Sequence, residues 1–399
     1  MLSLGGYVID NPTTCSVCGG RDQEVVVELP GLPLTDTFCK GPTVYSYSGL
    51  DQSLLYCSEC SHAQLLNIVE PSILYGNGYH FRTSTSTTAR SGTDNFVGFL
   101  MGLFPEKTYS TALDLGCNDL YLLNSLKPFV RQLVGVDPIW ADRENDVSDK
   151  AVRVFGCCIE DMDMREISAL APELIVCRHT IEHIANPAQV LRSLFDSAKD
   201  GAIFLFELPA FEPLVAGHRF DHVFHQHLHY FSLSSFRRMI DECGGHYIAH
   251  TWNYHDWGSL LVAFSKGGIH NSVDCRTNID IGSIKRNYDL FRNQFLATNK
   301  ILDSLKDRHI YGYGAAQMLP VVAYHLKNDL SCLECVLDDD PDKEGLSYWN
   351  ISVDVRHSSK AQDIEQSAVF ITAMDSLAFI LRRLFDLKPR RIIYPLHIL

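Results

Sequence analysis

The sequence has no long apolar run, no excess of basic charge and no low-complexity segment. Because no run approaches the roughly 20 apolar residues of a membrane-spanning helix, no membrane segment is expected. Asp and Glu number 48 against 34 Lys and Arg, which gives a net charge of -14 at pH 7. This balance argues against general nucleic-acid binding, which needs clustered basic residues. It leaves room for an anionic small substrate held by a local basic patch.

The sequence also lacks a secretion signal and a disulfide framework. Its first residues, Met1–Ile9, form too short an apolar stretch for a signal peptide and have no basic flank. Thirteen cysteines, an odd number spread through the chain, differ from the pattern of a secreted disulfide-bonded protein. We therefore expect a cytoplasmic protein. At 399 residues the chain is too long for one ordinary core, so two or three domains are expected.

One short stretch, Asp114-Leu-Gly116-Cys-Asn118-Asp119, indicates a cofactor site. Apolar residues up to Leu113 predict a buried strand, and Gly116 allows a tight turn into a helix over Tyr121–Leu126. A second apolar strand ends in Asp137. In the dinucleotide-binding fold an acid at this place hydrogen-bonds ribose hydroxyls.

The same stretch favours one cofactor over another. The second and third glycines of the dinucleotide fingerprint are missing, and the carboxylates of Asp114 and Asp119 would repel a pyrophosphate. They suit a ligand with a cationic amino group and no phosphate, which predicts S-adenosylmethionine. Further candidate contacts are Asn118, His179 and, near the third strand where an adenine amino group would be read, Glu160 and Asp161. The alternative is a structural turn beside a capping aspartate.

Two cysteine pairs predict a structural zinc site. Cys15-x-x-Cys18 and Cys57-x-x-Cys60 flank a segment with turn formers and short β-like runs, as in a zinc ribbon. Four thiolates are a preferred tetrahedral set for zinc, and four protein ligands leave no open position for catalysis. A redox role is less favoured, because neither pair opens a helix after a buried strand.

Apolar runs alternate with helical patterns between Tyr109 and Lys266. A helix through Phe96–Leu103 precedes this region, and its candidate strands are Ala112–Leu115, Leu133–Asp137, Leu174–Cys177 and Ala202–Leu208. Such alternation predicts a parallel sheet with helices on both faces.

A second α/β unit is expected after a helical segment over Ser283–Leu305. A strand from His309 runs into Gly312-Tyr-Gly314, and a strand after Cys335 ends in acids. Because a third glycine is absent at the usual spacing, the turn is either a dinucleotide site or a βα turn that only packs two domains together. The sequence therefore predicts three domains, at residues 1–72, 73–270 and 271–399.

Histidines gather after the strand that ends at Leu208. Four lie in His222-Val-Phe-His225-Gln-His227-Leu-His229, where the last three would share one face if the run were extended. Ligands bind beyond the carboxyl ends of strands in open α/β sheets. A base or substrate anchor is favoured over a metal site, because no carboxylate stands at ligand spacing. After the strand Leu174–Cys177, Glu182 and His183 are a second candidate pair, with Glu182 as a helix-dipole partner the alternative.

Together these motifs resemble the three-domain nucleotide-sugar C-methyltransferases of deoxysugar pathways. The cysteine pairs, the glycine turn at 114–119, Glu182-His-Ile-x-Asn-Pro187, His225-Gln-His-Leu-His-Tyr-Phe-Ser232 and Gly312-Tyr-Gly-Ala-Ala316 occur in family order over nearly the whole chain. The resemblance implies an α/β protein with a zinc-ribbon-like module, a Rossmann-like class I methyltransferase core and a C-terminal Rossmann-like domain. It also implies a nucleotide-linked ketosugar substrate, methylated on carbon through an enolate.

The resemblance further assigns residues. His227 matches the histidine that acts as base or on the enolate, His183 lines the same pocket, and Tyr79 lies in a substrate-facing aromatic stretch. The family usually reads Tyr-His-Glu-His where this chain has Phe224-His-Gln226-His227, so a phenol and a carboxylate are missing. The base stays open among His183, His225 and His227. O-methylation of a sugar or another small molecule, and a noncatalytic zinc-ribbon interaction protein, are the alternatives; the oligomeric state stays open.

Overall fold

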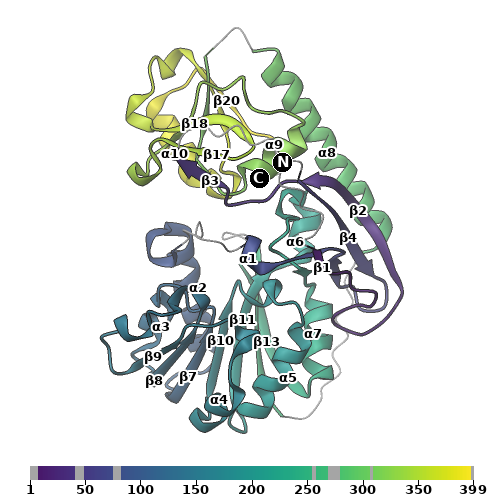
Figure 1. Ribbon diagram of the computed structural model, residues 1–399, viewed down its shortest axis with the longest axis vertical. Coiled ribbons are helices and arrows are strands. Elements are labelled where there is room, and N and C mark those ends of the chain that lie inside the picture. The colour runs from purple at the N-terminus through teal and green to yellow at the C-terminus, as the bar shows by residue number, and fades with distance from the viewer. Residues whose placement is uncertain are drawn as a thin grey trace.

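The computed structural model describes residues 8–40, 49–74, 82–253, 258–267, 279–305 and 309–396. Figure 1 shows two lobes, a lower one built from the central part of the chain and an upper one built from the C-terminal part. Strands of the N-terminal segment and the long helix that begins the C-terminal part run along the right-hand side and join the lobes. None of the helices in the described ranges combines the length and apolar character needed to cross a membrane.

The N-terminal segment is mostly β-structure. Its elements are β1 (Val8–Asp10), β2 (Gln23–Leu32), β3 (Phe38–Lys40), β4 (Leu50–Cys57), β5 (Ala63–Leu65), β6 (Ile68–Val69) and α1 (Pro71–Leu74). β2, β4 and β5 form an antiparallel sheet to which the central part of the chain adds β12 (His229–Tyr230), in the order β12-β5-β4-β2. The predicted zinc module thus shares its sheet with the histidine run.

The central lobe holds a seven-stranded sheet in the order β13-β14-β11-β10-β7-β8-β9. Its strands are β7 (Tyr109–Leu115), β8 (Val130–Val136), β9 (Val152–Phe155), β10 (Leu174–Arg178), β11 (Ile203–Pro209), β13 (Gly245–Asn253) and β14 (Ser259–Lys266). Its helices are α2 (Thr87–Leu103), α3 (Tyr121–Leu126), α4 (Met164–Leu170), α5 (Pro187–Ser197), α6 (Phe211–Ala216) and α7 (Leu233–Glu242).

The predicted sheet is confirmed in part. β7 to β11 are parallel, but β14 runs antiparallel to β11 and β13 antiparallel to β14, so the sheet is mixed. The helix expected over Tyr121–Leu126 is α3. α2 begins at Thr87 rather than near Phe96, because the Ser86 side chain accepts a hydrogen bond from the Ala89 N–H and caps the helix.

The C-terminal lobe is a second α/β unit with the sheet order β20-β19-β15-β16-β18-β17-β3. Its elements are α8 (Ile281–Asp303), β15 (Ile310–Tyr313), α9 (Leu319–Leu326), β16 (Val336–Asp338), β17 (Leu346–Tyr348), β18 (Ile351–His357), β19 (Ala368–Ile371), α10 (Leu377–Leu387) and β20 (Arg391–Ile393). The last strand of this sheet, β3, comes from the N-terminal segment and pairs with β17.

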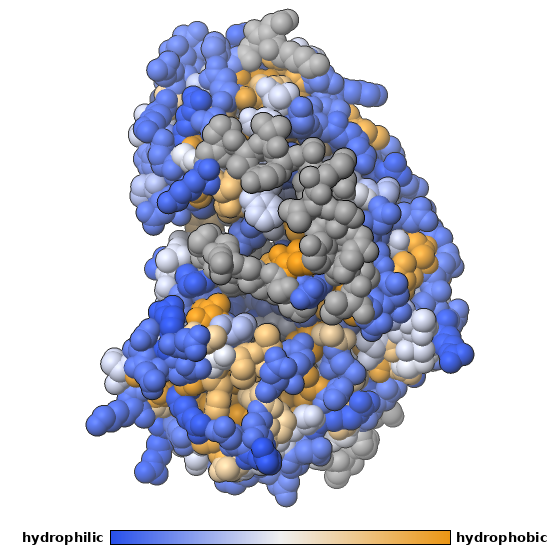
Figure 2. Space-filling model, viewed as in Figure 1, coloured by the Kyte–Doolittle hydropathy of each residue, from blue (hydrophilic) through white to orange (hydrophobic). Residues whose placement is uncertain are grey.

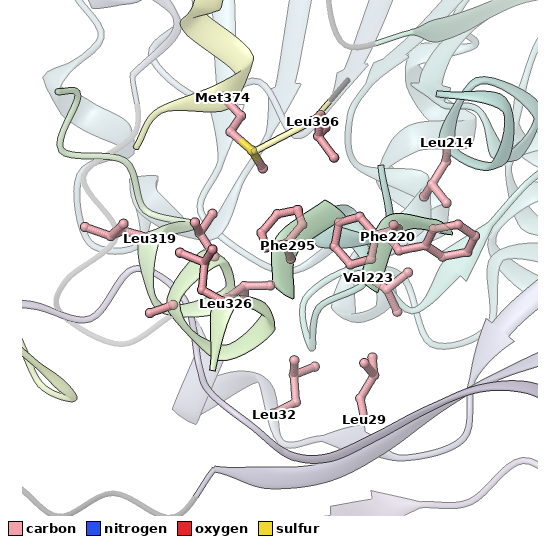
Figure 3. Close-up of a cluster of buried hydrophobic side chains, with 14 of the residues drawn as sticks. Leu29, Leu32, Leu214, Phe220, Val223, Phe295, Leu319, Leu326, Met374 and Leu396 are labelled. Atoms are coloured by element: carbon pink, nitrogen blue, oxygen red, sulfur yellow. The ribbon is translucent and has the colours of Figure 1, made fainter. Parts of the chain in front are cut away.

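The lobes are joined by one continuous apolar core, shown in Figure 3. Leu29 and Leu32 of β2, Phe220 before the histidine run, Phe295 of α8 and Leu326 of α9 are all fully buried in it. Burial at about 25 cal/mol per Å² of apolar surface makes such a core the main force that holds the lobes together. The N-terminal segment is therefore packed on both lobes.

Candidate functional site

The glycine turn after β7 is in close contact with the loop after β10. Gly116 has φ +77°, and its N–H donates to the Val136 oxygen at 2.8 Å. A Cβ atom at Gly116 would lie 2.2 Å from Oγ1 of Thr180. Only glycine fits both the backbone conformation and this contact.

Asp137, at the end of β8, organises the same turn. Its Oδ2 accepts from the Asn118 N–H at 2.9 Å and its Oδ1 from the Ile139 N–H at 3.0 Å. Burial raises the pKa of Asp137, against the effect of these two hydrogen bonds. The carboxylate keeps lone pairs for the two ribose hydroxyls that the sequence predicts it to bind.

Asp119 has an oxygen that suits a cationic ligand. Its Oδ2 accepts from the Ser84 N–H at 2.8 Å, whereas Oδ1 is buried and has no hydrogen-bond partner among the described residues. An orphaned carboxylate oxygen beside the glycine turn fits the amino group of S-adenosylmethionine.

Asp114 is buried near the end of β7. Burial raises its pKa to about 8; Arg178 opposes this rise and Asp137 adds to it. The part that Asp114 plays in excluding a pyrophosphate stays a prediction.

The predicted adenine contacts lie on the outer side of this region. Glu160 and Asp161 are exposed on the short 3-10 helix η4 (Ile159–Asp161) after β9. Glu160 also lines a cavity of about 120 Å³ with Ile159 and Asn186. Because neither Gly116 nor Asp137 lines it, the adenine contact stays a prediction.

The four predicted metal ligands lie together. Sγ of Cys15 is 3.5 Å from Sγ of Cys60, and Sγ of Cys18 is 3.6 Å from Sγ of Cys57. All four sulfur atoms lie within 4.8 Å of one another. Zn–S bonds of about 2.3 Å in a tetrahedron place sulfur atoms roughly 3.8 Å apart, whereas a disulfide needs about 2.05 Å. The set fits a structural zinc ion.

The zinc module contacts the histidine run through His229. Nε2 of His229 donates to the Ile184 oxygen at 2.9 Å, and its Nδ1 lies 3.2 Å from both Ser16 Oγ and His62 Nε2. Ser16 stands between two zinc ligands in the chain. The metal site therefore supports the loop that carries the other histidines.

The histidine run does not present one face, because it turns. The His227 N–H donates to the Phe224 oxygen at 3.1 Å, and a strand begins only at His229. His225 is fully buried, with Nε2 donating to the Leu32 oxygen at 3.0 Å and Nδ1 3.3 Å from Gln52 Nε2. His222 faces Asp375 of the upper lobe at 3.0 Å. Of these histidines, His227 is the one brought to His183.

His183 and His227 form a pair of candidate bases. Their rings are edge-to-face with centroids 4.9 Å apart, and Nδ1 of His183 donates to the backbone oxygen of Gln226 at 2.7 Å. Burial lowers the pKa of His183 to about 4 and that of His227 well below its usual value. Both rings are neutral at pH 7, which is the form that accepts a proton.

Glu182, the other member of the second candidate pair, completes this cluster. Its carboxylate is fully buried, neither oxygen has a hydrogen-bond partner in the described part of the chain, and Oε1 lies 3.9 Å from Nε2 of His183. Burial raises its pKa to about 8. The available signal was its position beside His183 in the loop after β10.

Two further residues surround the cluster. The predicted cofactor contact His179 has φ +49°, its N–H donates to the Glu207 oxygen at 2.8 Å, and its ring nitrogens are 3.8 Å from Glu182 and from Glu207. Glu207 binds Arg178 and accepts from Ser259 Oγ at 2.7 Å. Tyr79, the remaining predicted catalytic residue, lies outside the described residues.

The second glycine turn, at Gly314, is closed by the chain itself. The Ala315 N–H donates to Asp338 Oδ2 at 2.7 Å, and Lys343 Nζ contacts the Ala315 oxygen at 3.0 Å and Asp338 at 3.1 Å. These contacts use the groups that would face a pyrophosphate, and they favour the packing turn over a dinucleotide site.

Comparisons with known proteins agree with this arrangement. Residues 95–249 match the family described as "Methyltransferase domain", and residues 15–75 match that described as "Putative zinc binding domain". The chain is 24% identical over 257 residues to the C-methyltransferase NovU of Streptomyces niveus, which covers 62% of this chain and 59% of NovU. The match thus spans less than two thirds of that relative.

Solved structures show weaker likeness. The N-methyltransferase NodS from Bradyrhizobium japonicum WM9, in complex with S-adenosyl-L-homocysteine, has a TM-score of 0.36 at 12% identity over 49% of this chain and 95% of NodS. A Mesorhizobium loti S-adenosylmethionine-dependent methyltransferase has a TM-score of 0.36 at 11% identity over 42% of this chain and 96% of its own. At these TM-scores the likeness supports no further conclusion.

The central lobe is a methyltransferase domain with a class I, Rossmann-like sheet, and its turn fits S-adenosylmethionine. The chain joins this domain to a region that matches a putative zinc-binding domain and holds four clustered cysteines, and over part of its length it is similar to the C-methyltransferase NovU.

Proposed function

We propose that the protein uses S-adenosylmethionine to methylate a carbon of a nucleotide-linked keto-deoxysugar through an enolate. The observation that carries the proposal is the loop after β10. Thr180 of this loop packs against Gly116 of the glycine turn, and three residues later His183 lies beside His227. One short loop thus lies next to both the proposed methyl-donor turn and a pair of neutral bases. The similarity to NovU, a C-methyltransferase, supports carbon as the acceptor.

The chemistry requires proton removal before methyl transfer. A carbon beside a ketone becomes nucleophilic only when its proton leaves and the carbonyl takes up the charge. We assign proton removal to His227, whose ring packs on Phe224 with centroids 4.2 Å apart. His183 is held by the Gln226 oxygen and faces the same space. S-adenosylmethionine supplies the methyl group.

The proposal is tested by incubating the zinc-loaded protein with S-adenosylmethionine and a panel of keto-sugar nucleotides, with mass spectrometry of the products. A mass increase of one methyl group is expected for at least one sugar. His227→Ala should lose at least ~100-fold of the rate, in line with general-base catalysis. His309→Ala, an exposed histidine of the upper lobe, serves as the matched control and should keep the rate.

O-methylation is the second candidate, favoured by Phe224 and Gln226. A phenol and a carboxylate are absent from the run that carries His227, and a hydroxyl acceptor needs only one general base. The position of the new methyl group, read by NMR of the product, separates the two functions.

A further inference from the structure

Glu182 is an uncompensated acid at the centre of the histidine site. The side chain is 0% exposed, and neither oxygen makes a hydrogen bond within the described ranges. Burying an ionised carboxylate without a partner is costly, so a buried orphan of this kind requires a proton, a cation or a functional role.

Few of the groups that face Glu182 can exchange a proton with it. Oε1 of Glu182 lies 3.8 Å from Nδ1 of His179 and 3.9 Å from Nε2 of His183, and a ring nitrogen of His227 lies within 4.8 Å of a Glu182 oxygen. Glu207 is already bound by Arg178 and Ser259.

The remaining neighbours do not supply a proton. Tyr230 uses its hydroxyl to donate to the His222 oxygen at 3.1 Å, and burial raises its pKa far above neutrality. Burial likewise keeps the Cys177 thiol protonated. The histidine rings are the groups left to share a proton with Glu182.

We propose that Glu182 interacts electrostatically with His183 and His227 so that the cluster holds one proton among the three groups, and that Glu182 is the positioning residue that sets the charge of the base. This inference deepens the proposed function and rests on it. The backbone strengthens the link, because the Leu228 N–H donates to the backbone carbonyl oxygen of Glu182 at 2.9 Å and ties the two loops together. Glu182 thereby supplies from the loop after β10 the carboxylate that Gln226 lacks.

The proton balance is simple. The C–H bond beside the ketone breaks, its electron pair enters the enolate, and an N–H bond forms on His227. The step starts from the form of the cluster in which Glu182 is ionised and both rings are neutral, and this form grows as pH rises through the Glu182 pKa of about 8. The carboxylate then offsets the imidazolium charge while the enolate attacks the methyl group and S-adenosylhomocysteine is released. The proton then returns to solvent from the cluster. With a neutral amide at position 182, the buried imidazolium loses the Glu182 counter-charge and keeps only the attraction of Asp375 against the burial, which disfavours proton removal.

Glu182→Gln tests the proposal with two measurements that do not need methyl transfer. One is the pH titration of the His183 and His227 rings by ¹⁵N NMR in the protein without substrate. The other is exchange of the substrate C–H for deuterium, followed in D₂O without methyl donor. Glu212→Gln is the matched control, because Glu212 is another poorly exposed glutamate with an orphaned oxygen, and burial raises its pKa to about 7.

We expect Glu182→Gln to shift the ring titration to lower pH and to slow deuterium exchange by ~100-fold. Exchange in the unchanged protein should rise with pH toward a plateau, whereas the variant should give a flat profile. S-adenosylhomocysteine affinity should stay within ~3-fold. Glu182→Asp should recover part of the pH dependence, which also guards against a folding defect in the amide variant.

An unchanged ring titration in a folded Glu182→Gln protein would overturn the inference. A second bound metal ion besides zinc, present in the unchanged protein and lost in Glu182→Gln, would also overturn it by making Glu182 a ligand. If the unchanged protein exchanges no proton of any keto sugar, the proposed function fails, while the ring titration still decides the role of Glu182.

Discussion

Replacing Asp137 by Asn is expected to weaken S-adenosylhomocysteine binding strongly. Each oxygen of Asp137 accepts one backbone N–H, from Asn118 and from Ile139. An amide has one acceptor oxygen, so one of these N–H groups loses its partner, at a cost of about 1–3 kcal/mol. A charge-assisted hydrogen bond to a ribose hydroxyl contributes about 1.5–3 kcal/mol more. The unpaired N–H weakens the free and the bound protein alike, so the loss in binding comes from the ribose contact and is about 1.5–3 kcal/mol, or roughly 10- to 150-fold.

Calorimetric titration with S-adenosylhomocysteine measures this loss. Asp142→Asn is the control, because Asp142 is exposed in the same segment and its φ of +62° is one that Asn tolerates. Zinc content and circular dichroism of each sample establish that the variants are folded. Equal affinity of Asp137→Asn and the unchanged protein would refute the cofactor site. Failure of the folded, zinc-loaded protein to bind at all would favour an interaction protein.

Three further predictions follow from the structure. Removal of zinc, or the substitution Cys60→Ser, should increase amide hydrogen exchange at the His229 segment. The reason is that structural zinc contributes on the order of 10 kcal/mol of binding energy to the folded state. Unchanged exchange would show that the metal does not stabilise this loop. Gly116→Ala should lower the free energy of unfolding by about 1–3 kcal/mol in urea titration and should abolish cofactor binding. The reason is that φ of Gly116 is +77° and the new Cβ would collide with Thr180. Normal cofactor binding by this variant would contradict the prediction. Burial opposes ionisation of Asp375, but His222 and Arg219 outweigh it and hold its pKa well below the usual range. The stabilisation by ionised Asp375 is therefore present above about pH 4 and is lost as pH falls below it. Asp375→Asn should lower the free energy of unfolding by about 2 kcal/mol at pH 7 and should reduce its fall at acid pH. An equal fall at acid pH in both proteins would count against the prediction.

Local pattern and spacing predicted the parts of the site that are close in sequence. The strand, Gly116 turn and helix over Tyr121–Leu126 follow directly from periodicity and turn chemistry. The four cysteines were identifiable because ligand spacing is a local property of a tight turn.

Long-range pairing was not predictable in the same way. β3 spans only Phe38–Lys40 and joins the sheet of the upper lobe, while His229 and Tyr230 pair with β5. Strands this short carry no register signal, and their partners are decided by burial in the assembled core. β3 and β12 consequently link the first predicted domain to the other two, while the predicted boundary at 270 lies outside the described residues.

The role of Glu182 depended on the same long-range packing. In sequence the residue is equally compatible with a helix-dipole partner, since nothing local shows that it is buried. Only the fold shows that the loop after β10 turns its side chain into the space beside His183 and His227. His225 illustrates the converse, because its spacing suggested catalysis and its ring instead binds Leu32 and Gln52.

Figure 2 shows an indentation between the lobes on the left, opposite the joined side. The carboxyl ends of β10 and β11 continue into the loops that carry His183 and His227. If the proposed function holds, we expect the sugar of the substrate to lie near these histidines.

The most direct test of this account is NMR of the product formed from S-adenosylmethionine carrying a ¹³C-methyl group and the keto-sugar nucleotide that the protein accepts. The account predicts that the labelled methyl group is bonded to a ring carbon beside the ketone. A label on oxygen, or no labelled product from a folded protein that binds S-adenosylhomocysteine, would contradict it.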